Sequence, residues 1–221
     1  MEALPDSLLE TGVYGLPEAV QLTGVSSATA RRWFVGTSNS DPIFRPSIEP
    51  SQGRFAISFL DLIDLLVVGQ FRSTGVSFQT IRKAYEVLQA RWKTRHAFCH
   101  SDLLSDGQTI LVECVNRTSD KLLEEVIGRQ QAMPELLRQY LSEIEYDPSS
   151  HIAAMWHIAE GVILDPGRNF GKPIVPSGVS TSVLYRAAIG NGRDFELVAD
   201  LFKVSEQGVM NAVLFEESLA A

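Results

Sequence analysis

The sequence predicts a mainly α-helical fold with short β-hairpins, in the α+β class. Apolar residues recur at helical spacing in three stretches, residues 16–34, 59–92 and 118–146. Residues 35–58 and 152–179 instead mix short β-branched or aromatic runs with Gly, Pro and Ser, which is typical of strands and turns. A length of 221 residues fits two compact units or one large unit.

Composition divides the chain into three expected parts. Residues 1–117 form an N-terminal domain, which includes a loose arm at 1–14. Residues 118–147 form a helical linker. The apolar stripes of this linker suit either core packing or dimerisation. After the sequence Asp-Pro-Ser-Ser, residues 148–221 form a C-terminal domain with strands and a second pair of helices.

The stretch 16–34 predicts two short helices joined by a tight turn. Gly24 supplies the left-handed turn, and Ser26 or Ser27 can cap the second helix. Spacing turns Ala30, Trp33 and Phe34 inward. The residues left on the outer face are Ser27, Thr29, Arg31 and Arg32. Hydroxyl and guanidinium groups bond phosphates and base edges, so this helix suits a major-groove reader, although a helix pair that only packs remains an alternative.

A short hairpin, or wing, is expected directly after these helices. Extended pieces at 43–45 and 54–57 flank a turn at 50–53, and they carry Arg45 and Arg54. Arginine favours the DNA backbone and the minor groove, so we expect both residues to contact DNA. A plain surface hairpin is the alternative. Further on, Arg82 and Lys83 could add phosphate contacts, although a solvated helix face explains them as well.

Charge and cysteine content limit the kinds of partner and the cellular compartment that we expect. The net charge is −8, with +1 in residues 1–100 and −9 in residues 101–221. This asymmetry suits a protein that touches DNA with one end and another protein with the other. Two cysteines, no secretory signal pattern and no apolar run of membrane-span length favour a cytoplasmic protein without membrane contact.

Catalytic and metal-binding patterns are absent from the sequence. The histidines and cysteines of residues 96–114 match no standard zinc spacing, and Asp106-Gly107 predicts a hairpin among them. Those residues are His96, Cys99, His100 and Cys114. The chain has no Gly-rich phosphate loop and no nucleophile motif. We therefore expect no enzyme activity, no metal and no cofactor.

The tail, residues 194–219, repeats the opening helical pattern. Its expected core positions are Ala199, Leu201, Val204, Ser205 and Val209. Its outer face carries carboxylates, which DNA phosphates repel. We therefore expect this second helix-turn-helix to pack on a partner and not on DNA.

Residues 13–92 resemble the MerR-type winged helix-turn-helix. The resemblance rests on LPEAVQLTGVSSATARRW, the short wing, and FLDLIDLLVVGQFRSTGVSFQTIRKA, in that order. It implies DNA binding as a dimer, with Arg31, Arg32 and Arg54 as contacts. The long dimerisation helix usual in that family is missing.

Residues 162–215 are similar to a small VapB-type antitoxin domain. The run Gly171 to Val175 and the following Gly178-Val179 carry the similarity, although Ser180 stands where the family has an arginine. The two resemblances together indicate a fused antitoxin whose partner is a PIN-like ribonuclease toxin. The residues expected to bind that partner are Lys172, Ile174, Val175, Glu206, Glu216 and Glu217.

The sequence therefore favours a homodimeric antitoxin that neutralises a PIN-like toxin and represses its own operon at operator DNA. An acidic partner can cover the basic RNA-binding surface of such a nuclease. The alternative is a MerR-like winged-helix transcriptional regulator whose C-terminal domain dimerises or senses a ligand.

Overall fold

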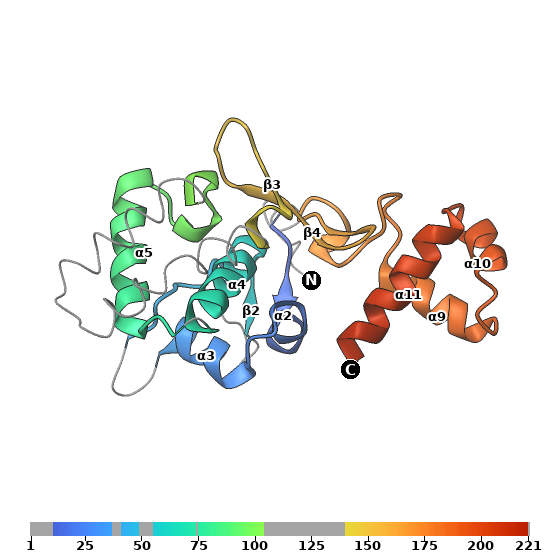
Figure 1. The fold of residues 1–221 in the computed structure, drawn as a ribbon, viewed down its shortest axis with the longest axis horizontal. Coiled ribbons are helices and arrows are strands. Elements are labelled where there is room, and N and C mark those ends of the chain that lie inside the picture. The colour runs from blue at the N-terminus through green and yellow to red at the C-terminus, as the bar shows by residue number, and fades with distance from the viewer. Residues whose placement is uncertain (1–10, 37–40, 49–54, 74, 104–139, 221) are drawn as a thin grey trace, which may run out of the picture. The chain divides into compact units, whose positions relative to one another are not determined.

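The computed structural model describes residues 11–36, 41–48, 55–73, 75–103 and 140–220. It divides into two compact units (Figure 1). The larger unit comprises residues 15–153, and the C-terminal unit comprises residues 1–14 and 154–221. The chain passes between them within β1 (Tyr14–Gly15) and near the start of β4 (Ala153–Ala159). The expected linker helix and the hairpin at Asp106-Gly107 lie largely outside the described residues.

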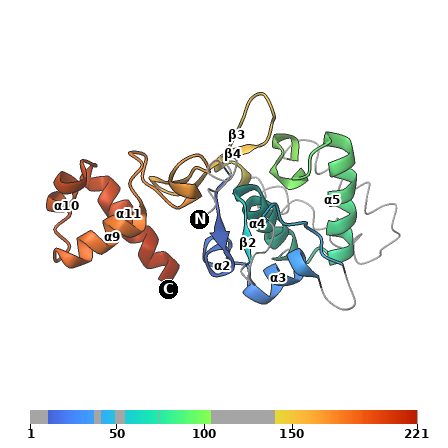
Figure 2. The ribbon, with the colours of Figure 1, turned by 180° about the vertical axis from the view of Figure 1, so that it is seen from behind.

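The described residues of the larger unit contain four helices, short 3₁₀ turns at Ala97–Cys99 and Ser101–Leu103, and the strand β2 (Ala56–Ile57). The helices are α2 (Leu16–Thr23), α3 (Ser27–Val35), α4 (Phe59–Ser73) and α5 (Phe78–Trp92). Helix α4 lies between α2 and α5 in both views (Figures 1 and 2). Every residue from 61 to 68 of α4 is buried, so α4 is the core of this unit.

Side-chain caps fix where α4 and α5 begin. The Ser58 hydroxyl accepts from the Asp61 amide at 3.1 Å, while the Asp61 carboxylate accepts from the Ser58 amide at 3.0 Å. This reciprocal pair satisfies two backbone donors at the start of α4. Ser77 caps α5 by accepting from the Thr80 amide.

The predicted turn between α2 and α3 is confirmed. Gly24 ends α2 with φ of 70°, and its amide donates to the Val20 carbonyl at 2.9 Å. Ser26, and not Ser27, caps α3 by accepting from the Thr29 amide. The buried residues of α3 are Ala30, Trp33 and Phe34, as expected from their spacing.

The expected wing is formed only in part. Residues 43–45 are not a strand, because the amides of Ile43 and Phe44 both donate to the Trp33 carbonyl. The centres of the Phe44 and Phe34 rings lie 5.2 Å apart, so this segment packs on the core. Strand β2 covers part of the second expected arm, and Arg54 lies outside the described residues.

The end of the expected linker helix is also different. Residues 144–146 form the strand β3 (Ile144–Tyr146) and not helix. A turn follows, in which the Asp147 carboxylate accepts from the Ser149 and Ser150 amides at 3.0 and 2.7 Å. Proline at 148 disfavours helical backbone at the preceding residue, so the helix cannot continue to this turn.

In its described residues, the C-terminal unit contains three helices that pack on one another and a small antiparallel sheet that the last helix contacts. β4 pairs with β5 (Val162–Leu164) in the register Trp156 to Leu164 and His157 to Ile163, and Ile174 bridges to Ile163. Beyond the 3₁₀ turn Asn169–Gly171, the helices are α9 (Thr181–Gly190), α10 (Phe195–Phe202) and α11 (Glu206–Ala220). Their core consists of Val175, Leu184, Ala188, Val198, Ala199, Val209, Ala212 and Val213.

The last part of the expected arm, residues 11–14, is bonded into this unit. The Tyr14 hydroxyl donates to the Gly171 carbonyl at 2.6 Å, and the Val13 amide donates to the Phe170 carbonyl at 3.0 Å. The Lys172 ammonium donates to the Val13 carbonyl at 2.9 Å. Because Tyr14 is fully buried, these residues belong to the folded core.

Two expected core positions of the tail point outward. Leu201 is 61% exposed, and Phe202 takes the inward place beside it. Ser205 is exposed because its hydroxyl caps α11, accepting from the Gly208 amide at 3.0 Å. Ala199 and Val209 are buried as expected.

Gly171→Ala should lower the free energy of unfolding by about 2 kcal/mol. Gly171 has φ of 77°, and an added Cβ would collide with the Tyr14 hydroxyl. Gly190→Ala is the control, because Gly190 lies at the end of α9 with no atom within 4 Å of the added Cβ. Urea unfolding followed by circular dichroism compares them, and equal losses in both variants would contradict the packing argument.

Candidate nucleic-acid interface and partner surface

Helix α3 presents its predicted polar residues at the surface. Ser27, Arg31 and Arg32 are exposed, whereas Thr29 is half-buried and its hydroxyl accepts from Ser26 at 2.8 Å. The Arg32 guanidinium lies 5.1 Å from the centre of the Phe78 ring, a cation–π contact that orients it while leaving it exposed. The face predicted to read DNA is therefore accessible, with a serine and two arginines available on it.

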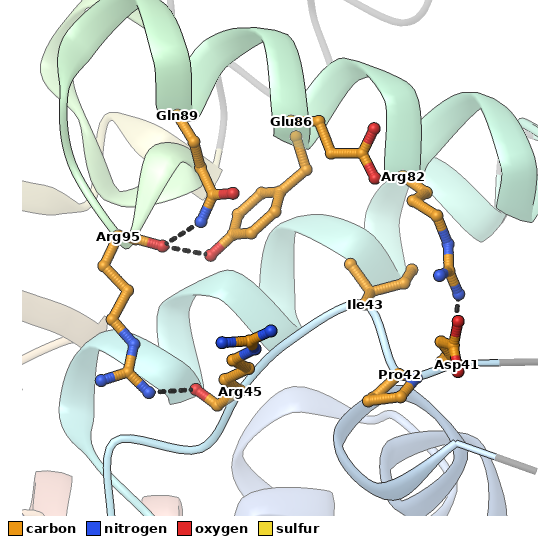
Figure 3. Close-up of a pocket in the computed structure, with 9 residues that line it drawn as sticks. Asp41, Pro42, Ile43, Arg45, Arg82, Glu86, Gln89 and Arg95 are labelled. Carbon is orange, nitrogen blue, oxygen red and sulfur yellow. Dashed lines mark hydrogen bonds between the residues drawn. The ribbon is translucent and has the colours of Figure 1, made fainter.

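A polar cavity of about 800 Å³ lies between α5 and the segment that follows α3 (Figure 3). We name it the arginine pocket, after Arg45, Arg82 and Arg95, which line it with Asp41, Glu86 and Gln89. Arg82 and Gln89 come from α5, and Arg45 comes from the opposite wall. Arg45, predicted as a wing residue, thus lines a cavity and does not stand on a hairpin.

Backbone carbonyls hold two of these arginines in place. Arg95 donates to the Arg45 and Pro46 carbonyls at 2.8 and 2.9 Å, and Arg82 donates to the Asp41 carbonyl. The Arg95 carbonyl in turn accepts from the Gln89 amide at 2.8 Å (Figure 3). These bonds fix the walls of the pocket without neutralising the guanidinium charges.

A buried polar network lies behind the pocket. Asp64 of α4 accepts from the Tyr85 hydroxyl at 3.0 Å and from the Phe98 amide at 3.2 Å, and one of its oxygens lies 2.8 Å from His96 Nδ1. The His96 Nε2 lies 3.1 Å from the Ser47 hydroxyl. Three elements that are distant in sequence therefore share one carboxylate.

The network perturbs the titration of its members. Burial by itself lowers the pKa of His96, but the hydrogen bond to Asp64 and its negative charge outweigh burial and raise that pKa above its usual value. Burial, followed by the charge of Asp64, raises the pKa of Tyr85 and of the Cys99 thiol. Both groups are therefore protonated donors at neutral pH.

Asp64, His96 and Cys99 are also the group, within the described residues, that could hold a metal ion. Their ligand atoms lie within 4.8 Å of one another, and carboxylate, imidazole and thiolate are all zinc ligands. The Cys99 thiol instead donates to the Leu60 carbonyl at 3.2 Å, so the three residues are satisfied as a hydrogen-bond network. Cys114, considered with them, lies outside the described residues.

The residues expected to bind a partner differ in accessibility. Ile174 and Val175 are 0% and 1% exposed, so they offer no surface to a partner in this fold. Val175 belongs to the core beneath α9 and α11, and Ile174 bridges to Ile163 of β5. Lys172 is half-buried against Tyr14, and Glu216 accepts from the Thr181 hydroxyl. Glu206 is exposed at the start of α11, and Glu217 is half-buried and pairs with Arg193.

A different surface of this unit carries exposed apolar side chains. Leu197 and Leu201 are 42% and 61% exposed and lie one turn apart on α10. The acidic Glu196 and Asp200 stand beside them and are also exposed. We name these four residues the α10 face. Exposed leucines among carboxylates are a typical composition for a protein-binding surface.

The α10 face and the role of Arg95 were not predicted from the sequence. The i, i+4 spacing of Leu197 and Leu201 was a usable signal, but Val198 and Phe202 have the same spacing on the same helix. Arg95 carries no motif, because its role follows from the backbone that it bonds.

None of the helices in the described part of the chain is both long and apolar enough to cross a membrane.

The contribution of His96 to stability should fall as pH rises above about 6.5, the pKa of an unfolded histidine. Because the folded pKa of His96 is raised, the folded state binds more protons in the window between the two pKa values. His96→Gln should remove this component, which is at most about 1.4 kcal/mol per pH unit. Urea unfolding between pH 6 and pH 9 measures it. The exposed His157→Gln is the control, and an unchanged pH slope in His96→Gln would refute the assignment.

The chain is similar to a curated protein and to a solved structure. The chain is 25% identical, over 91% of its length and 92% of the relative, to a Mycobacterium tuberculosis protein named "Putative antitoxin VapB45". The crystal structure of Rv2018 from the same organism matches with a TM-score of 0.73 and 24% identity, covering 90% of this chain and 96% of that one. No protein-family model matches the sequence. The fold is thus one already seen in a solved structure.

Proposed function

We propose that this chain is the antitoxin of a toxin–antitoxin pair, which neutralises a PIN-like ribonuclease toxin and represses its own operon as a homodimer on operator DNA. One observation carries the proposal: the similarity to a relative named as an antitoxin extends over 91% of this chain and 92% of that relative. Similarity over both units, and not over a DNA-binding part alone, favours a shared role.

The DNA-binding part of the proposal rests on α3. Arg31 and Arg32 are exposed on a helix that follows a tight turn, and Ser27 lies at the first position of the same helix. An exposed second helix with arginines near a basic cavity suits entry into a major groove. Because the chain as a whole is acidic and repels DNA phosphates, DNA binding is confined to this face.

The toxin-binding part rests on the C-terminal unit. Residues 154–221 carry eight acidic and five basic residues, and the α10 face adds exposed leucines to that charge. A ribonuclease needs a basic surface to hold RNA, and an acidic surface with an apolar centre can cover it. We therefore assign the toxin to the α10 face, since Ile174 and Val175 are buried.

Arg31→Ala and Arg32→Ala should each weaken binding to operator DNA. A variant that loses a phosphate contact should also reduce the slope of log affinity against log salt by about one. Fluorescence anisotropy at several salt concentrations measures both quantities. Arg186→Ala removes one exposed positive charge from the C-terminal unit and serves as the control. Equal affinities for the α3 variants and the wild type would exclude α3 as the reader.

Leu201→Glu should weaken toxin binding by about thirtyfold, as expected for the loss of a central apolar contact worth about 2 kcal/mol. The tagged full chain, purified from its native cells, should retain a PIN-like ribonuclease in fixed stoichiometry, and calorimetry with that protein gives the affinity. Val87→Glu changes an equally apolar exposed residue on α5 and is the matched control.

One outcome of this experiment locates the toxin-binding surface, and another would change the proposed function. Loss of toxin binding in Leu201→Glu alone assigns the partner to the α10 face. The absence of any ribonuclease from the purified protein, with DNA retained, would favour the transcriptional regulator over the antitoxin.

A further inference from the structure

The arginine pocket carries more positive charge than its neighbours compensate. Three arginines line it against two carboxylates, Asp41 and Glu86. In the described part of the chain, none of the three guanidinium groups forms an ion pair with a carboxylate. The pocket therefore has a surplus of positive charge inside a partly enclosed cavity, where an anion gains more than it would on an open surface.

The three arginines also have unused hydrogen-bond donors. Arg82 and Arg95 each use one terminal nitrogen on backbone carbonyls, which leaves most of the five N–H groups of each guanidinium free. Arg45 points toward α5 across the pocket, and no hydrogen bond of its side chain is drawn (Figure 3). Because backbone carbonyls hold Arg82 and Arg95 in position, these two guanidinium groups bind a tetrahedral oxyanion with less loss of side-chain entropy than unrestrained ones.

We propose that the arginine pocket binds a phosphate group, held by Arg45, Arg82 and Arg95. A cavity of about 800 Å³ lies within the size range of small-molecule sites. The carboxylates of Asp41 and Glu86 and the amide of Gln89 favour a phosphate whose carrier also offers hydrogen-bond donors. Nucleotides, free or within a nucleic acid, have this chemistry.

The pocket is joined to the candidate DNA-reading helix by one aromatic ring. The Arg82 guanidinium lies 5.9 Å from the centre of the Phe78 ring, and Arg32 of α3 lies 5.1 Å from the same centre. Because the pocket lies next to α3, the phosphate is supplied either by a free nucleotide or by the backbone of a bound nucleic acid. The second source rests on the DNA binding proposed above, whereas the first does not.

The test uses the full chain and two kinds of probe. Wild type, Arg45→Gln, Arg82→Gln and Lys93→Gln are titrated with adenosine monophosphate and with inorganic phosphate by calorimetry, and with duplex DNA by anisotropy. Lys93→Gln is the control, because Lys93 is an exposed cation at the C-terminal end of α5 that does not line the pocket. Arg45→Gln is the variant expected to fold normally, since its side chain holds no bond drawn in the pocket.

Binding of adenosine monophosphate that weakens about tenfold in Arg45→Gln and Arg82→Gln, and not in Lys93→Gln, supports a free nucleotide as the source, whereas the same pattern with inorganic phosphate alone supports a phosphate site without a nucleoside. No binding of a free probe, with DNA affinity and salt slope reduced in the same two variants alone, supports the nucleic-acid backbone. If no free probe binds and the pocket variants bind DNA like Lys93→Gln, the proposal is overturned. If the wild type binds no DNA, the proposed DNA binding fails, and the titrations with free probes alone decide the pocket.

Discussion

The larger unit depends on the buried carboxylate of Asp64. Burying a charged group costs several kcal/mol unless donors surround it. Here a tyrosine hydroxyl, a backbone amide and an imidazole surround the carboxylate, although burial outweighs them and raises the pKa of Asp64 above its usual value. These donors come from α5 and from residues 96–98. The carboxylate therefore fixes α5 against α4, and through the Tyr85 hydroxyl, which also lies 2.6 Å from the Arg95 carbonyl, it fixes one wall of the arginine pocket.

Local chemistry made much of this fold predictable. Ser58, Ser77 and Gly24 each act within four residues of their own position, so the sequence suffices to place the helix ends. The helical spacing of α3 predicted its exposed polar face for the same reason. Whether that face reads DNA depends on a partner that the chain itself does not contain.

Features that depend on contacts between residues distant in the sequence were not predictable. Helix α10 has two apolar stripes at the same spacing, Leu197 with Leu201 and Val198 with Phe202, and only the packing of α9 and α11 selects the second as the core. Likewise, residues 43–45 have strand composition, but Phe44 finds aromatic partners in Phe34 and in Tyr85 of α5, which the sequence places far away. Periodicity identifies an apolar face, and tertiary contacts decide which face is buried.

The two candidate surfaces share no residue, since the arginines of α3 belong to the larger unit and the α10 face belongs to the C-terminal unit. A substitution on one surface therefore cannot weaken binding at the other by removing a direct contact. If a toxin alters the affinity for DNA, that effect must come through a change in the folded state or in assembly, and DNA must alter the affinity for the toxin by the same factor. Measuring both affinities in one protein thus separates a coupled repressor from two independent binding modules.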